Sequence, residues 1–255
     1  VLEGITDASR NAAVESWLSS PPAMSETIEK NISAFGRGDE ILSQDNGTLM
    51  YLGQKERKFL LNPLAVKLAG ISQDNKSLKL IDIIREHCLK RKSKALVFVN
   101  RHITAMYLLG ILEQHFDGRL KVGCTVDFRE GGFGLKEDRS EILKRFSPRS
   151  HSPISDYDLD KEYDVLICTD ADGIGVNLQD ADTVVNYDPP KSADVLFQRA
   201  GRILRMTTDP NRIVHLYRLI PSVVDFLDAQ SPIYNDVKEI FERITYRHDK
   251  SKSIL

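Results

Sequence analysis

Cysteine is scarce in this sequence, and the few cysteines present are poorly placed for shared chemistry. Cys88, Cys124 and Cys168 stand far apart in a chain of 255 residues and never form a C-x-x-C pair. A disulfide framework or a zinc site needs closer or paired cysteines. We therefore expect three reduced thiols in the protein core, no metal site, and a reducing cytosol as the surroundings.

Long apolar runs are absent as well. No stretch approaches the roughly 20 apolar residues that a membrane-spanning helix needs. The first ten residues, VLEGITDASR, lack the basic and apolar regions of a signal peptide. We expect a cytoplasmic protein with no membrane partner. Because the chain starts with Val1 rather than Met, we also expect a piece of a longer protein.

An excess of one charge is the third missing feature. The chain carries 35 Lys and Arg against 37 Asp and Glu, a net charge of −2. The surface as a whole therefore does not attract nucleic acid, and any such contact must come from local groups. One candidate is the cluster Lys90, Arg91, Lys92 and Lys94. Cations are also favoured at a helix C-terminus, and we prefer this second interpretation.

The hydrophobic pattern divides the chain into three parts. They are a helical appendage or inter-lobe segment at 1–75, a main domain at 76–220, and a C-terminal helix and tail at 221–255. The first part has three stretches of helical composition, at 8–18, 25–35 and 54–70. Pro21 and Pro22 separate the first two, and Pro63 interrupts the third. This part shows no catalytic pattern.

The main domain alternates short apolar runs with amphipathic stretches. The runs suit strands buried on both faces and lie at 94–100, 120–126, 163–170, 181–188 and 212–219. The helical stretches lie at 76–93, 103–116, 136–146 and 192–204, with polar loops at 127–134 and 148–162. This order predicts a doubly wound α/β domain with a mainly parallel sheet. In such domains, ligands bind at the carboxyl ends of the strands.

A polar cluster, ICTDADGIGVNLQDAD at 167–182, follows the third expected strand. Gly173 and Gly175 let the backbone approach a bulky partner such as a sugar-phosphate. Thr169 and Asn177 add small hydrogen-bonding side chains, which suit phosphate contacts without base readout. The same pattern also fits a tight strand-to-helix turn with Asn177 as the helix cap.

A second cluster, QRAGRILR at 198–205, places two arginines three residues apart. In a helix, Arg202 and Arg205 lie on one face about one turn apart, and Gly201 permits close packing. Two adjacent guanidiniums repel each other unless an anion lies between them. A triphosphate is such an anion, and a guanidinium stabilises charge that develops on a transferring phosphoryl group. The alternative is a solvated basic face.

Together, the clusters resemble the C-terminal RecA-like lobe of superfamily 2 helicases and translocases. LVFVN at 96–100 looks like motif IV, VLICTDADGIGVNLQDADTVVNYDPP at 165–190 like motif V with its following strand, and QRAGRILR like motif VI. The three occur in order, at the expected spacings, within about residues 76–220. The resemblance implies a P-loop NTPase-type lobe that lacks its own phosphate loop.

Two positions suggest a branch of the superfamily. With Asn177 and Gln198, the chain resembles the bacterial Swi/Snf-type ATPases. DEAD-box RNA helicases usually carry Asp and His at these two positions. Two departures count against a chromatin remodeller: the chain has Lys-Ser at 191–192, where the remodeller family often has Trp-Asn, and Met-Thr at 206–207, where it often has Gly-Gln. The resemblance thus favours a bacterial helicase-like translocase.

The resemblance also implies roles, residue by residue. Arg202 and Arg205 would be arginine fingers that reach the γ-phosphate of ATP, and Gln198 would position that phosphate or the attacking water. The residues expected at the nucleotide cleft are Gly173, Gly175 and Asn177, the last near the ribose or between the cleft and DNA. Those expected on the nucleic-acid backbone, with duplex DNA as the preferred partner, are Thr169, Asn100 and Arg101.

The features that hold ATP and Mg²⁺ in this mechanism are missing from the sequence. It has no G-x-x-x-x-G-K-[ST] phosphate loop, and DFREGGFG at 127–134 does not supply one. It also has no acidic strand end of the D-E-x-x type. The resemblance implies that an N-terminal RecA-like lobe upstream of Val1 carries these two features and holds ATP and Mg²⁺. It also implies that the isolated chain is inactive. Two alternatives remain: a non-catalytic RecA-like docking module, or the lobe of an RNA helicase.

Overall fold

The computed structural model describes residues 15–34, 62–68, 70–72, 74–126, 138–150, 159–170, 177–190, 193–204 and 212–219. These residues fall into two compact units, which meet in the sequence between Asp74 and Asn75. The C-terminal helix and tail expected at 221–255 and the Gly-rich segment 127–134 lie outside the described residues.

In the first unit, two prolines begin a helix. A short helix at 15–19 is followed by α2 (Pro21–Ala34), so α2 starts earlier than the expected position at residue 25. Proline suits this place because the first helical residues have no N–H partner within the helix. The Ser20 hydroxyl caps α2 by accepting a hydrogen bond of 3.3 Å from the Ala23 N–H.

A small core joins α2 to a helix at 62–68, whose first turn contains Pro63. Ile28 of α2 and Ala65 form a buried cluster there. The Ser25 hydroxyl donates a hydrogen bond of 3.1 Å to the Ala65 carbonyl. Contacts between the two helices therefore combine apolar packing with one buried polar bond.

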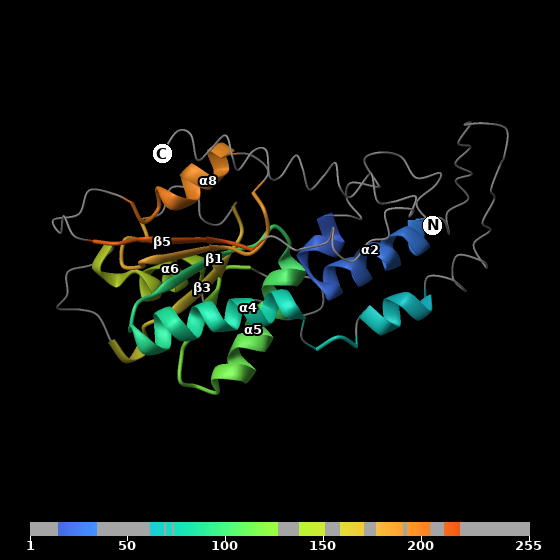
Figure 1. The fold of residues 1–255 in the computed structure, drawn as a ribbon, viewed down its shortest axis with the longest axis horizontal. Coiled ribbons are helices and arrows are strands. Elements are labelled where there is room, and N and C mark those ends of the chain that lie inside the picture. The colour runs from blue at the N-terminus through green and yellow to red at the C-terminus, as the bar shows by residue number, and fades with distance from the viewer. Residues whose placement is uncertain are drawn as a thin grey trace. The chain divides into compact units, whose positions relative to one another are not determined.

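Five parallel strands form the sheet of the second unit (Figure 1). They are β1 (Ala95–Phe98), β2 (Val122–Cys124), β3 (Val165–Cys168), β4 (Thr183–Asn186) and β5 (His215–Arg218). Their order across the sheet is β2-β3-β1-β4-β5, and every adjacent pair is parallel. The predicted doubly wound parallel sheet is confirmed.

Helices cover both faces of this sheet. They are α4 (Asn75–Ile84) with a π-helical continuation (Arg85–Lys90), α5 (His102–Phe116), α6 (Arg139–Phe146) and α8 (Ala193–Ala200). Short 3₁₀ turns at Pro148–Ser150 and Leu159–Lys161 flank part of the expected polar loop. Figure 1 shows α4 and α5 on one face of the sheet and α8 on the other.

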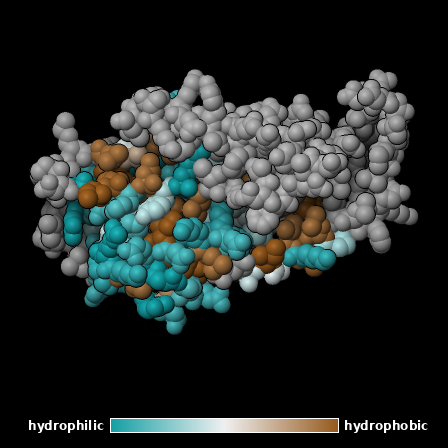
Figure 2. Space-filling view, viewed as in Figure 1, coloured by the Kyte–Doolittle hydropathy of each residue, from teal (hydrophilic) through white to brown (hydrophobic). Residues whose placement is uncertain are grey.

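Alternate strand residues face opposite layers, as the pleat of a strand requires. Val97 and Ile167 belong to a buried cluster with α4 and α5, whereas Phe98 and Leu166 belong to a second cluster with Phe146 of α6. Over α4 and α5 the visible surface is mainly hydrophilic (Figure 2). Amphipathic helices therefore separate this side of the sheet from water.

The α8 helix ends before the expected position at residue 204. Its last residue is Ala200, after which Gly201 donates a hydrogen bond of 2.7 Å to the Phe197 carbonyl. The Arg202 and Ile203 N–H groups then bond three residues back, at 3.2 and 3.0 Å. This is a 3₁₀-type tightening, common at helix ends, and it turns the chain before Arg202 can continue the helix.

All three cysteines are buried free thiols, which confirms the expected core placement. Burial raises the pKa of the Cys88 thiol to about 12. Such a thiol stays protonated at neutral pH and packs as a small apolar side chain. Among the residues that the structure describes, no group of three or more His, Cys, Asp or Glu is placed to hold a metal ion.

Polar residues gather where the central strands end. Asn100 follows β1, Asp170 follows β3 and Asp188 follows β4. The chain leaves β1 toward α5 on one face and leaves the neighbouring β4 toward α8 on the other. In doubly wound sheets, such a reversal is the usual place of a ligand site. This carboxyl edge of the sheet is therefore the first place to look for function.

Candidate functional site

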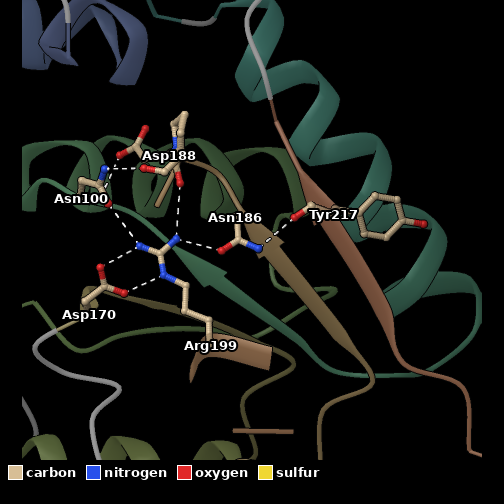
Figure 3. A network of polar contacts seen from close by, with 7 residues as sticks. Asn100, Asp170, Asn186, Asp188, Arg199 and Tyr217 are labelled. Atoms are coloured by element: carbon tan, nitrogen blue, oxygen red, sulfur yellow. Dashed lines mark hydrogen bonds and ion pairs between the residues drawn. The ribbon is translucent and has the colours of Figure 1, made fainter. Parts of the chain in front are cut away.

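One buried arginine connects the strand ends at the carboxyl edge of the sheet (Figure 3). Arg199 lies on α8 and is 2% exposed. A guanidinium carries five N–H groups, and each needs an acceptor when it is buried. The structure provides an acceptor for each, from Asp170, Asn186, Asp188 and Asn100.

Asp170 binds Arg199 through both carboxylate oxygens. Arg199 Nε donates to Oδ1 at 2.6 Å and Nη2 donates to Oδ2 at 2.9 Å. This two-bond fork is the strongest and most directional form of an arginine–carboxylate contact. The Asp170 side chain is 41% exposed while that of Arg199 is 2% exposed, so the pair spans the boundary between the core and the surface.

The remaining donors of Arg199 reach the ends of β1 and β4. Nη1 donates to Asn186 Oδ1 at 2.8 Å and, more weakly, to the Asp188 carbonyl at 3.4 Å. Nη2 donates to Asn100 Oδ1 at 3.2 Å. The guanidinium carbon also lies 4.8 Å from the centroid of the Phe98 ring, within reach of a cation–π contact.

Asp188 extends the network to the start of α4. One carboxylate oxygen accepts a bond of 2.9 Å from Lys76 Nζ, and the other accepts one of 2.8 Å from the Asn100 backbone N–H. Lys76 Nζ also lies 4.0 Å from the centroid of the Tyr187 ring. Because the Lys76 and Asp188 side chains are 13% and 2% exposed, this ion pair is shielded from solvent.

The three residues expected on nucleic acid lie at this edge in different surroundings. The Asn100 side chain accepts from Arg199 and donates to the Pro189 carbonyl at 3.0 Å. Arg101 is half-buried and precedes the first turn of α5. Thr169 is 6% exposed and immediately precedes Asp170. The fold thus brings all three to one edge of the sheet, and their role on nucleic acid stays a prediction.

Arg202 is held by its backbone. Its N–H donates to the Arg199 carbonyl at 3.2 Å, and its carbonyl accepts a bond of 3.2 Å from the Leu178 N–H. The second bond joins the QRAGRILR segment to the segment after Asn177. Among the residues that the structure describes, no acceptor bonds to the half-buried Arg202 guanidinium. This side chain therefore differs sharply from that of Arg199.

The other residues expected at the nucleotide are only partly described. Gln198 is exposed on α8. Asn177 is half-buried, and its Oδ1 is a buried acceptor with no partner among the described residues. Gly173, Gly175 and Arg205 lie outside the described residues, so their roles stay predictions.

Arg199, Asp170 and Asp188 are the residues that sequence reasoning missed. The two aspartates could have been found from the sequence, because each directly follows a buried strand and functional residues concentrate at strand ends. Arg199 had no such signal. Its position inside QRAGRILR is that of an ordinary helical residue between Gln198 and Arg202.

Three of the four residues in the basic cluster before β1 make contacts within the protein. Lys90 and Arg91 pair with Glu86 at 3.0 and 3.2 Å, and the hydrogen bond from Lys90 is the main cause that lowers the pKa of Glu86. Lys94 Nζ donates to the Phe146 carbonyl at 2.6 Å and pairs with Glu162 at 3.2 Å. Burial lowers the pKa of Lys94. These contacts favour a structural role for the cluster.

The five-stranded parallel sheet with helices on both faces is the architecture of a RecA-like domain. Residues 75–207 match the family described as the helicase conserved C-terminal domain. The chain belongs to this family, the C-terminal domain of superfamily 2 helicases. No helix among the described residues is long and apolar enough to cross a membrane.

Several known helicases are similar over part of their length. An uncharacterized ATP-dependent helicase of Bacillus subtilis (strain 168), YqhH, is 30% identical over 176 residues, which are 66% of this chain and 26% of YqhH. Human ATP-dependent RNA helicase DDX55 is 25% identical over 154 residues, 60% of this chain and 22% of DDX55. The chain thus spans about a quarter of each of these relatives.

Two solved structures are among those that are similar to this chain. The C-terminal part of the Fun30 ATPase domain has a TM-score of 0.47 and 18% identity, covering 92% of this chain and 78% of that one. The E. coli DEAD-box protein SrmB, bound to regulator of ribonuclease activity A, has a TM-score of 0.40 and 20% identity, covering 60% of this chain and 79% of that one.

Proposed function

We propose that this chain is the C-terminal motor lobe of an ATP-dependent helicase or translocase, and that Arg202 and Arg205 are its arginine fingers. The observation that supports this proposal is the contrast at the end of α8. Arg199 has an acceptor for every N–H, whereas Arg202 is fixed through its backbone and meets no acceptor among the described residues. A fixed backbone with a free guanidinium is what a finger requires.

Several described residues support a nucleotide site at this edge. Within the described part of the chain, the donors of the Arg202 guanidinium have no acceptor and suit phosphate oxygens, and the Asn177 Oδ1 has no partner and suits a ribose hydroxyl. Gln198, exposed on the same helix, is available to orient a phosphate oxygen or water, and Gly173 and Gly175 would line the cleft. ATP with Mg²⁺ supplies the phosphoryl group and the charge that the fingers neutralise. Both would be held mainly by an N-terminal RecA-like lobe of the same protein.

On the nucleic-acid side, Thr169, Asn100 and Arg101 would contact the backbone, with duplex DNA as the proposed substrate. Asn177 and Gln198 support a relation to the Swi/Snf-type ATPases, because DEAD-box proteins usually carry Asp and His at these positions. RNA is the second candidate substrate, because DDX55 and other relatives are named RNA helicases. The proposed location is the cytoplasm.

The test is the ATPase activity of the full-length parent protein, with Arg202→Ala beside the wild type. Both are assayed without nucleic acid and with duplex DNA, single-stranded DNA or RNA. We expect stimulation by duplex DNA and a loss of about 10³-fold or more in kcat for the variant, the usual contribution of an arginine finger.

Arg149→Ala is the matched control. Arg149 is exposed and lies after α6, and its backbone N–H donates a hydrogen bond of 3.0 Å to Asp180, which precedes β4. It should keep wild-type activity. If wild type and Arg202→Ala are equally inert with every nucleic acid, the lobe is a docking module. Stimulation by RNA alone would replace the DNA proposal with an RNA helicase.

A further inference from the structure

We propose that Arg199 is a positioning residue for ATP hydrolysis, which fixes the candidate finger Arg202 by tying the end of α8 to the ends of three strands. This inference rests on the proposed function. It concerns a residue whose five N–H donors all bond within the protein. Its effect on the reaction passes through the backbone of Arg202.

The first step is the direct backbone link. The Arg202 N–H donates to the Arg199 carbonyl at 3.2 Å, and Leu204 and Ile203 both donate to the Ala200 carbonyl at 3.0 Å. These bonds form the turn after α8. Because the Arg199 carbonyl accepts one of these bonds, the position of Arg199 determines the position of the Arg202 backbone.

The second step is the anchoring of Arg199 itself. Its guanidinium binds Asp170 after β3, Asn186 at the end of β4 and Asn100 after β1. All five donors are used inside the protein, so this side chain has none left for a phosphate. Three strand ends that are far apart in sequence thus share one rigid, planar fork.

The third step is the opposite side of Arg202. Its carbonyl accepts from the Leu178 N–H at 3.2 Å, and Leu178 is buried in the core cluster with Ile203. The Arg202 backbone is therefore held from both sides. Asp170 lies before the segment 171–176 and Leu178 lies after it, so Arg199 and Arg202 contact residues on either side of this segment, within the proposed motif V.

Lysine cannot replace arginine in this arrangement. An ammonium has three donors on a single atom, whereas the acceptors around Arg199 are spread over the plane of its fork. An Arg199→Lys variant keeps the positive charge next to Asp170 but loses contacts with at least one strand end. We expect the end of α8 to shift and Arg202 to shift with it.

The experiment is steady-state ATPase kinetics of the full-length protein with saturating nucleic acid, comparing wild type, Arg199→Lys and Arg202→Ala. For Arg199→Lys we expect kcat to fall about 10- to 100-fold, because a misplacement of about 1 Å can cost that much. KM for ATP should change less than about two-fold, since the lost contact acts in the transition state. A purely structural role would not separate kcat from KM.

Arg145→Lys is the control for loss of arginine hydrogen bonds at a half-buried position away from the site. Arg145 donates to the Lys161 carbonyl at 2.7 Å and to the Tyr163 hydroxyl at 3.0 Å, and it lies 4.2 Å from the Tyr163 ring centroid. These contacts precede β3 and lie away from the strand ends. This variant should keep wild-type kcat, and thermal unfolding of each variant shows whether it is folded.

The outcomes separate the two proposals. If Arg202→Ala removes nucleic-acid-stimulated hydrolysis while folded Arg199→Lys keeps wild-type kcat, the positioning role is wrong and the proposed function stands. If the wild type shows no stimulated hydrolysis, the proposed function itself fails. If Arg199→Lys does not fold, Asp170→Asn is tested in its place, because the Asp170 side chain is 41% exposed. A kcat for Asp170→Asn equal to that of the wild type would overturn the inference.

Discussion

Arg199 and Arg202 stand three positions apart, yet their guanidiniums have opposite surroundings. Arg199 is 2% exposed and fully hydrogen-bonded, whereas Arg202 is half-buried with no acceptor among the described residues. Sequence reasoning singled out Arg202 and passed over Arg199. The reason is physical: the acceptors of Arg199 come from positions 100, 170, 186 and 188, and spacing along a chain does not show which strand ends meet.

A buried histidine, His87, lies away from the candidate site and has a perturbed pKa. His87 is 1% exposed in the π-helical turn, and its Nε2 lies 2.7 Å from the Tyr217 hydroxyl. Its Nδ1 is buried without a partner among the described residues. Burial, followed by the nearby charges of His215 and Arg91, lowers the pKa of His87.

This lowered pKa predicts a loss of stability in mild acid. Below the unfolded pKa of about 6.5, the unfolded chain binds a proton that folded His87 does not, so stability falls until the pH reaches the folded pKa. The slope from this group is at most about 1.4 kcal/mol per pH unit. Denaturant unfolding at pH 7.5 and 5.5 should show a larger loss for wild type than for His87→Gln.

Exposed His102 at the start of α5 supplies the control for this measurement. His102→Gln should lose as much stability in acid as the wild type does. An identical pH dependence for wild type and His87→Gln would show that His87 does not contribute to the acid sensitivity.

At the scale of elements, the pattern of the sequence predicted the type and order of the main-domain elements, while their ends depended on local geometry. All five expected strands are present, because apolar runs such as ALVF and VLIC are buried on both faces. The end of α8 was placed too late because the N–H groups of Arg202 and Ile203 bond three residues back rather than four. The start of α2 was placed too late because Pro21 begins the helix rather than preceding it.

One glycine shows how tightly the strand β2 packs. A Cβ added at Gly123 would lie 2.9 Å from Cδ2 of the Tyr163 ring. That ring cannot move freely, because Arg145 lies 4.2 Å from its centroid and bonds to its hydroxyl at 3.0 Å. We expect Gly123→Ala to lower the free energy of unfolding by about 1–3 kcal/mol, as overpacking typically does.

Gly110 in α5 makes the matched control, because a Cβ there meets nothing within 4 Å. Alanine is favoured over glycine inside a helix by about 0.5–1 kcal/mol, so Gly110→Ala should stabilise the protein. Chemical denaturation measures both variants. Equal stability of Gly123→Ala and wild type would mean that the Tyr163 side chain yields without cost.

At the scale of the whole molecule, the chain has the proposed finger but no phosphate loop. G-x-x-x-x-G-K-[ST] does not occur in its 255 residues. Binding and orienting the triphosphate with Mg²⁺ needs such groups. We therefore predict that the purified 255-residue chain hydrolyses ATP no faster than the background, measured as phosphate release with Mg²⁺ and with or without duplex DNA.

The full-length protein in the same assay is the positive control for this prediction. Mg²⁺-dependent turnover by the isolated chain, absent from a chain carrying Arg202→Ala, would contradict it. Such a result would place a complete catalytic site within these residues and remove the need for a second lobe.

The Arg199 network also restricts the routes by which this domain can diverge over generations. Removing a single acceptor such as Asn186, which is 0% exposed, leaves a buried donor unsatisfied at about 1–3 kcal/mol. A domain is stable by only about 5–15 kcal/mol, so several such losses in turn would remove much of its stability. In related domains that lack Arg199, we expect the acceptors at 100, 170 and 186 to be replaced together. These positions should therefore co-vary although they are distant in the chain.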